Sequence, residues 1–159
     1  MLPINRILCP TDFSEPSLEA IKAAVELAVH FNAKLYVVHV VAEVPRPGWT
    51  SSFGLSPEVY AVELRDYEAG MRRSADRKLR EVAEAYQGGS LLIETVVGSG
   101  DSAEEIVRIA DEEKADLITI STHGLSGWRL LVYGSVTERV LRLAHCPVLT
   151  IRAPHERSS

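Results

Sequence analysis

The sequence predicts a single α/β domain with a parallel sheet covered by helices on both faces. Short β-branched runs alternate with amphipathic segments of helical period, and strands joined through helices require right-handed crossovers. The chain has 159 residues, 46% of them hydrophobic, which is enough for one domain to bury a core. No internal repeat or boundary interrupts the pattern, so we expect one domain over residues 1–153 and a polar tail over 154–159.

The first part of the chain carries two predicted strands with a helix between them. Residues 4–10 form a short apolar run that ends at a proline, and residues 34–41 form a continuous β-branched run, as expected of buried strands. Residues 14–31 predict a helix that Ser14 can cap, with Pro16 in its first turn. One face of this helix is apolar, and it consists of Leu18, Ile21, Val25 and Ala28.

The rest of the chain begins with a loop and continues the alternation. Residues 42–57 are rich in proline and glycine and predict a long loop, whose role stays open. A long amphipathic helix follows, which Gly70 could interrupt; its apolar positions are Leu64, Met71, Leu79, Val82 and Tyr86. The remaining expected elements are a strand over 91–97, a helix over 101–114, a strand over 116–121, a helix from Ser135 and a strand over 147–152.

Composition excludes several classes of function. Seventeen basic against twenty-two acidic residues give a net charge of −5, which argues against the broad basic face that nucleic-acid binding requires. No run approaches the roughly 18 apolar residues of a membrane span, and no signal peptide is visible. Cys9 and Cys146 border apolar segments, and no spacing matches a metal site, so we expect a reduced, cytoplasmic protein.

Two glycine-rich patterns resemble functional motifs but fail on their context. Residues 98–103 match the dinucleotide fingerprint, yet Asp101 would stand where a pyrophosphate should lie, and no acidic residue ends the next strand. A tight turn with Asp101 and Glu104 as a capping box is the better interpretation. Residues 124–128 resemble the nucleophile elbow of serine hydrolases, but Trp128 replaces its last glycine.

A third pattern, Gly134-Ser135, stands at the start of a helix and leaves two interpretations open. The first amides of a helix lack intrahelical partners and carry the positive end of its dipole, so a phosphate could bind there. Gly134 would allow close approach, and Ser135 would add a hydroxyl donor; without a lysine this is not a Walker A loop. Alternatively, Ser135 and Glu138 form a capping box in a helix that binds nothing.

Taken together, five stretches resemble the universal stress protein family, and the likeness extends from about Ile4 to Arg152. They are CPTDFSEPSLEAI, LYVVHVV, GDSAEEIVRIADEEKADLITIS, STHG-LSGWRLLVY-GSVTERVL and HCPVLTIR. The resemblance implies an open five-stranded parallel sheet of order 3-2-1-4-5. It also implies a ligand site where the chain reverses between the first and fourth strands.

The same resemblance implies that this site binds ATP with Mg²⁺, without a protein metal site. The family's ATP-binding pattern is G-x2-G-x9-G-(S/T); Gly124 and Gly134-Ser135 match it, and Ser121 replaces the first glycine. We expect serine to be tolerated there. Asp12 would contact the ribose or base and Val40 the adenine edge, whereas His39 is expected to pack within its strand. The implied ligand residues are Pro10, Thr11, Asp12, Val40, Ser121, Thr122, His123, Gly124, Leu125, Ser126, Gly127, Gly134, Ser135, Val136 and Thr137.

The implied function is a nucleotide-binding module of the stress response that acts through its conformation or its choice of a protein partner. The resemblance also implies a homodimer paired through residues 147–152. We expect no catalytic residues and no efficient chemistry. One alternative, favoured by Ser121, is a stress protein that binds no nucleotide and acts through protein contacts; a lesser one is a slow ATP hydrolase using His123.

Overall fold

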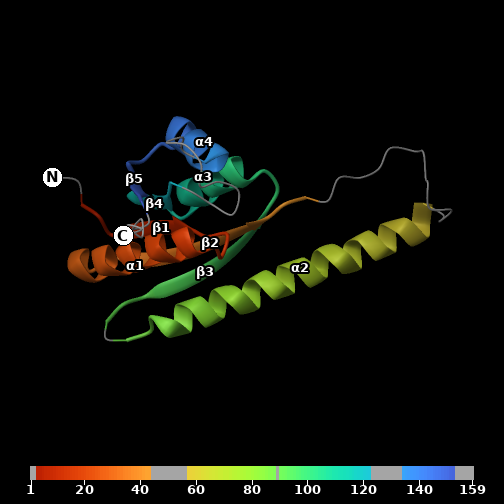
Figure 1. Cartoon of the computed structure of the whole chain (residues 1–159), viewed down its shortest axis with the longest axis horizontal. Coiled ribbons are helices and arrows are strands. Elements are labelled where there is room, and N and C mark those ends of the chain that lie inside the picture. Colours follow the sequence, from red (N-terminus) through yellow and green to blue (C-terminus); the bar gives the residue numbers. More distant parts are fainter. Residues whose placement is uncertain (1–2, 44–56, 89, 123–133, 153–159) are drawn as a thin grey trace, which may run out of the picture.

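The computed structural model describes residues 3–43, 57–88, 90–122 and 134–152. Within them, strands and helices alternate as the sequence predicts (Figure 1). In chain order the elements are β1 (Arg6–Pro10), α1 (Glu15–Phe31), β2 (Lys34–Val41), α2 (Pro57–Ala85), β3 (Ile93–Ser99), α3 (Ser102–Glu112), β4 (Leu117–Ser121), α4 (Ser135–Leu143) and β5 (Val148–Ile151).

The five strands form one sheet in the order β3-β2-β1-β4-β5, and all four pairings are parallel. The predicted fold class and strand order are therefore confirmed. Several boundaries move by one or two residues: β1 begins at Arg6 rather than at residue 4, and β3 spans Ile93–Ser99 rather than 91–97.

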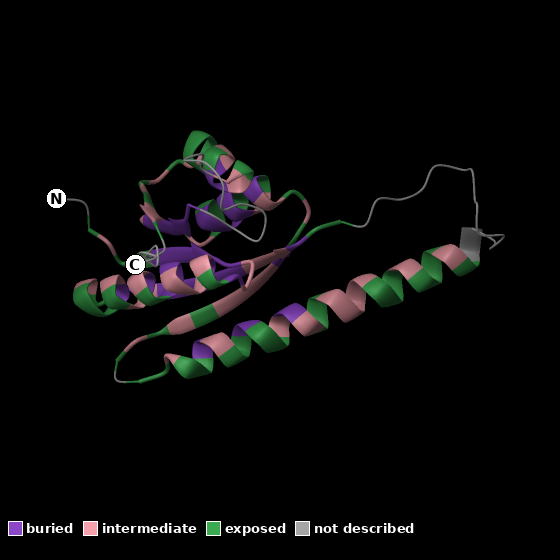
Figure 2. Ribbon diagram, in the orientation of Figure 1, coloured by how far each residue is buried: buried purple, intermediate pink, exposed green. Residues whose placement is uncertain are grey.

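The core consists of two apolar layers, one on each face of the sheet. The layer between the sheet and the helices α1 and α2 contains Ile7, Ile21, Leu35 and Leu79, which are all fully buried. Under α3 and α4 lie Leu8, Val38, Ile106, Ile118 and Val140, and each of them is at most 3% exposed. Because both faces are covered, β1 and β4 are buried along almost their whole length, as the purple strands of Figure 2 show.

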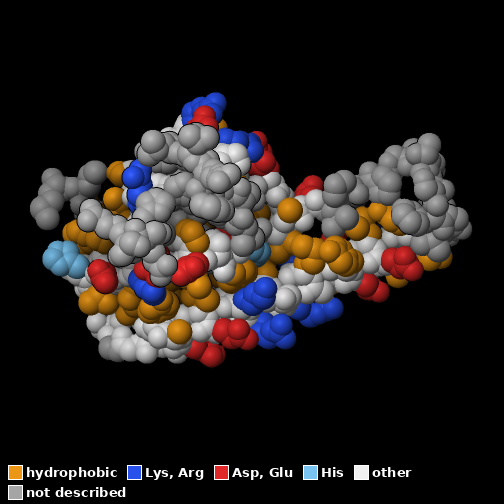
Figure 3. Space-filling view, viewed as in Figure 1, with side chains coloured by type: hydrophobic (Ala, Val, Ile, Leu, Met, Phe, Trp, Pro, Cys, Tyr) orange, Lys and Arg blue, Asp and Glu red, His pale blue; other side chains and the backbone are white. Residues whose placement is uncertain are grey.

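The helix α2 is an uninterrupted helix of 29 residues, so Gly70 does not break it. Its C-terminal part buries Ala75, Leu79 and Ala83 against the sheet. Its N-terminal part projects beyond the sheet, where Val62 and Tyr67 are more than half exposed (Figures 1 and 2). Figure 3 shows hydrophobic side chains gathered along this projecting part.

Both cysteines are free in the structure; Cys9 is fully buried, and burial raises the pKa of its thiol. No helix of the described ranges has the length and apolar character needed to cross a membrane. In the same part of the chain, no cluster of three His, Cys, Asp or Glu side chains could hold a metal ion.

Candidate functional site

The sheet opens between the carboxyl ends of β1 and β4. β1 pairs with β2 at five positions, but with β4 only at Ile7↔Leu117 and Leu8↔Ile118. Arg6 O accepts a hydrogen bond from Asp116 N, so the even-numbered residues of β1 point their backbone groups toward β4. Pro10 is the next such residue whose nitrogen would continue the ladder, and proline has no N–H to donate. The strands therefore separate where the strand order reverses.

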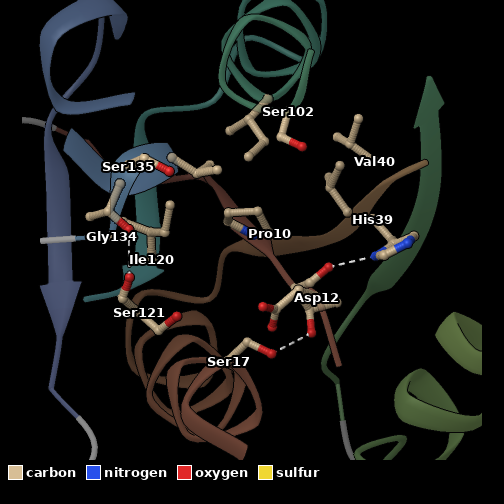
Figure 4. Close-up of a pocket in the computed structure, with 15 residues that line it drawn as sticks. Pro10, Asp12, Ser17, His39, Val40, Ser102, Ile120, Ser121, Gly134 and Ser135 are labelled. Carbon is tan, nitrogen blue, oxygen red and sulfur yellow. Dashed lines mark hydrogen bonds between the residues drawn. The ribbon is translucent and has the colours of Figure 1, made fainter. Parts of the chain in front are cut away.

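A pocket of about 210 Å³ occupies this opening (Figure 4). Residues from the carboxyl ends of the three central strands form its floor, and the N-terminal turns of helices form its walls. The lining residues are Pro10, Thr11, Asp12, Ser17, Val38, His39, Val40, Ser102, Ile106, Ile120, Ser121, Gly134, Ser135, Val136 and Thr137. None of these described lining residues is Lys or Arg, so an anion here would be met by backbone amides and hydroxyls.

The structure brings nine of the predicted ligand residues together in this lining. These nine are Pro10, Thr11, Asp12, Val40, Ser121, Gly134, Ser135, Val136 and Thr137. Thr122 lies beside the pocket rather than in its lining: its N donates to Ile151 O, and its O accepts from Gly134 N. His123, Gly124, Leu125, Ser126 and Gly127 lie outside the described residues.

The turn after β1 is held by a network of hydrogen bonds. Thr11 N donates to Val38 O of β2 at 2.8 Å, and the hydroxyls of Thr11 and Ser17 are 2.8 Å apart. The Asp12 carboxylate accepts from Ser14 N at 3.0 Å and from the Ser14 hydroxyl. Ser14 in turn caps α1, since its Oγ accepts from Ser17 N. The first turn of α1 and the Asp12 side chain are thus held as one unit.

The start of α4 does not contain the predicted capping box. Gly134 is the N-cap, with no side-chain cap, and Ser135 is the first helical residue. Glu138, the other half of the predicted box, pairs instead with Arg142 at 2.7 Å. Ser135 is one position too far along the helix to cap it, so the capping-box interpretation is wrong. Ser135, Val136 and Thr137, the first three residues of α4, line the pocket.

Ser121 does not need the backbone freedom of glycine. It is the last residue of β4, in register with Ile151, and it is absent from the described non-glycine residues of positive φ. Its carbonyl accepts from Thr137 Oγ1 at 2.7 Å, which ties β4 to α4. Serine therefore fits this position without strain in the main chain.

The glycines at 98–103 serve packing and a turn. A Cβ on Gly98 would stand 2.6 Å from Glu105 Cγ, and Gly100 has a φ of +131°. Asp101 caps α3 by accepting from Ala103 N and Glu104 N, both at 3.1 Å. Glu104 does not complete the predicted capping box, because its Oε1 faces Arg139 of α4 at 3.2 Å. The dinucleotide motif is thus a tight turn with a helix cap.

Arg139 joins α3 and α4, two neighbouring helices that both contribute to the lining of the pocket. Its Nη1 lies 2.6 Å from Asp101 Oδ2. The hydrogen bond from Arg139, followed by that from the Glu104 amide, lowers the pKa of the Asp101 carboxyl. One carboxylate thus both caps α3 and holds α4.

Six lining residues are absent from the predicted ligand set: Ser17, Val38, His39, Ser102, Ile106 and Ile120. Ser102 and Ile106 are one helical turn apart in α3, directly after the Asp101 cap, and this spacing could have indicated them. Val38 and Ile120 face the same side of the sheet as α3 and α4, which becomes evident only once the strand order is known.

Known proteins resemble this chain over nearly its whole length. The sequence profile of the Universal stress protein family matches residues 3–152. Universal stress protein MJ0531 of Methanocaldococcus jannaschii is 37% identical over 152 residues, covering 94% of this chain and 83% of that protein.

Solved structures also resemble this chain over nearly its whole length. The structure of MJ0577, also from Methanocaldococcus jannaschii, is 25% identical in sequence and superimposes with a TM-score of 0.77. The match covers 97% of this chain and 99% of the MJ0577 chain. A universal stress protein in complex with cAMP is 26% identical with a TM-score of 0.59, over 94% of this chain and 97% of its own. On its sequence and on its fold, this chain belongs to the universal stress protein family.

Proposed function

We propose that the protein binds ATP in the pocket between β1 and β4, and that the bound state alters its conformation or its choice of partner in the stress response. The observation that carries this proposal is the start of α4: its first residues line the pocket at the reversal of strand order, and the helix has no side-chain cap there. A similar protein was solved with cAMP, another adenine nucleotide.

The pocket residues can be assigned to the parts of the nucleotide. Val40 stands on the far side of the pocket from Gly134 and Ser135 in Figure 4, which suits an adenine edge at Val40 and phosphates at α4. Asp12 lies between these two ends and would accept a ribose hydroxyl. Residues 121–127 would follow the ribose and phosphates, as the family pattern implies.

Magnesium would be held mainly by the phosphates. No group of three potential ligands exists in the described part of the chain, and Mg²⁺ commonly keeps several waters and binds through substrate phosphates. The Ser135 hydroxyl, at the first position of α4, is the lining oxygen best placed to add one protein ligand.

The test is binding by the intact protein. Purified protein is denatured, and the released small molecules are separated and identified by absorbance; the refolded or apo protein is then titrated with ATP, with and without Mg²⁺. We expect saturable binding that Mg²⁺ strengthens. No binding at millimolar ATP would contradict the proposal.

That negative result would favour the second candidate function, a stress protein that acts through protein contacts alone. Ser121, where the ATP-binding pattern has glycine, is the observation that favours it. Slow hydrolysis by His123 is the third candidate; steady turnover that disappears in His123→Ala while ATP still binds would support it.

A further inference from the structure

The turn between β1 and α1 contains a strained residue. Phe13 has a φ of +63°, a left-handed conformation that is unusual for a bulky side chain. The two other described non-glycine residues of positive φ, Asn32 and Lys114, follow the ends of α1 and α3, where left-handed residues commonly terminate helices. Phe13 instead precedes a helix. Such strain persists only where the surroundings impose it.

Two other elements hold the Phe13 ring. The His39 ring of β2 lies 4.5 Å from it between centroids, tilted by 34°. The ammonium of Lys78, on α2, lies 5.3 Å from the ring centroid. The ring also packs against the apolar layer under α1 and α2. The side chain of residue 13 is therefore fixed from two sides, and its backbone cannot relax independently.

His39 holds the same turn by a second contact. Its Nδ1 lies 2.7 Å from Thr11 O, and because a carbonyl can only accept, Nδ1 carries the proton and donates (Figure 4). His39 thus contacts the residue before Asp12 through a hydrogen bond and the residue after it through its ring. Packing within the strand was expected of His39; its hold on both neighbours of Asp12 was not.

We propose that Phe13 and His39 are positioning residues for Asp12. They hold the turn in the conformation that places the Asp12 carboxylate at the pocket, bonded to Ser14 N, and so set the affinity for the ribose part of the ligand. Neither side chain needs to contact the nucleotide through its ring. The effect on affinity rests on the proposed function, whereas the effect on the turn does not.

Two variants separate the two contacts. Phe13→Gly keeps a residue that adopts a positive φ freely but removes the ring, and His39→Phe keeps a ring beside Phe13 but removes the donor. Phe31→Ala is the matched control. Phe31 also packs on the layer under α1 and α2 and against a histidine, His30, with centroids 4.9 Å apart, but at the opposite end of α1 from the pocket.

The first measurement is a double-mutant cycle on ATP affinity. We expect Phe13→Gly and His39→Phe each to weaken ATP binding about tenfold, the scale of one lost hydrogen bond, and Phe31→Ala to leave it unchanged. In an Asp12→Ala background the two variants should cause no further loss, because they act through Asp12. Two results would overturn the proposal. One is an unchanged ATP affinity in both single variants; the other is a further loss of affinity of about tenfold when either variant is made in the Asp12→Ala background.

The second measurement needs no ligand. The Ser14 amide bonds to the Asp12 carboxylate, so its hydrogen exchange under native conditions reports where that carboxylate lies. We expect Ser14 exchange to be about tenfold faster in both variants. Ala24, in the middle of α1, should exchange at its original rate, which shows that the variant is folded.

The two measurements distinguish the possible failures. If the wild-type protein binds no ATP, the proposed function fails, and Ser14 exchange alone then decides the role of Phe13 and His39. Unchanged Ser14 exchange in folded Phe13→Gly and His39→Phe protein would show that these side chains serve packing only.

Discussion

Ser121 shows how one substitution in a motif can leave a site intact. The residue is the last one of the strand β4, and its carbonyl accepts a hydrogen bond from Thr137 Oγ1. Glycine at this position would therefore offer space but not a required backbone conformation.

For Ser121→Gly we expect ATP affinity to remain level or to rise, because a Cβ is removed from the pocket lining. Titration calorimetry against the wild-type protein measures the change. A large loss of affinity would mean that the serine hydroxyl itself binds the nucleotide.

Gly134 allows a sharper test of the phosphate position. Its φ of −55° and ψ of 147° are accessible to any residue, so Gly134→Val should fold normally. We expect the variant to lose ATP binding, because the valine side chain would fill the space in front of the first amides of α4.

Gly88→Val is the matched control for Gly134→Val. A Cβ at Gly88 would meet no atom within 4 Å, so this variant should bind ATP as the wild-type protein does. Equal affinity in Gly134→Val and Gly88→Val would place the phosphates elsewhere.

At the scale of elements, the contact between α3 and α4 depends on an ion pair that acid should break. Arg139 lowers the pKa of Asp101, so this carboxylate contributes stability that is present above its ordinary pKa of 3.8 and is lost as pH falls through the lowered value. Both side chains are about 40% exposed, which keeps the contribution small.

Asp101→Asn isolates this contribution, because asparagine still caps α3. We expect a lower melting temperature than wild type at pH 7, and a gap that narrows as the pH falls below 3.8 toward the lowered pKa. Arg142→Gln is the control on α4, since the ion pair that the structure shows for Arg142 lies within its own helix, with Glu138. A gap that stays constant with pH would exclude the ion pair as its cause.

At the scale of the whole molecule, β5 is an edge strand that we expect to pair with a second copy. The carbonyls of Pro147 and Ile151 accept from β4, so the backbone groups of Val148 and Thr150 face outward. Leu149 is 39% exposed at this edge. Unpaired edges are commonly covered, and a two-fold contact would pair β5 with its own copy.

Thr150→Pro tests this pairing without touching the β4 ladder, because it removes only an outward N–H. We expect the wild-type protein to have a dimer mass at micromolar concentration and the variant a monomer mass, with unchanged circular dichroism. Light scattering measures the two masses, and a monomeric wild-type protein would contradict the expected dimer.

The sequence predicted the order and type of every described element, because the hydrophobic period reports burial and the helices cover both faces of the central strands. It predicted Asp12, Val40 and Ser135 at the pocket through the family pattern. It could not indicate Val38 or Ile120, since their place depends on strands that meet only after folding. The sequence also could not indicate the left-handed backbone conformation of Phe13, because the residues that contact its ring belong to β2 and α2.

Pro10 has a consequence that extends beyond any one ligand. Since the imino nitrogen of Pro10 cannot extend the ladder, the opening between β1 and β4 depends on the main chain as well as on the side chains that line it. Substitutions among the lining residues can therefore change the chemical preference of the pocket while this part of the opening is kept. A residue with a backbone N–H at this position would be able to donate one further hydrogen bond toward β4.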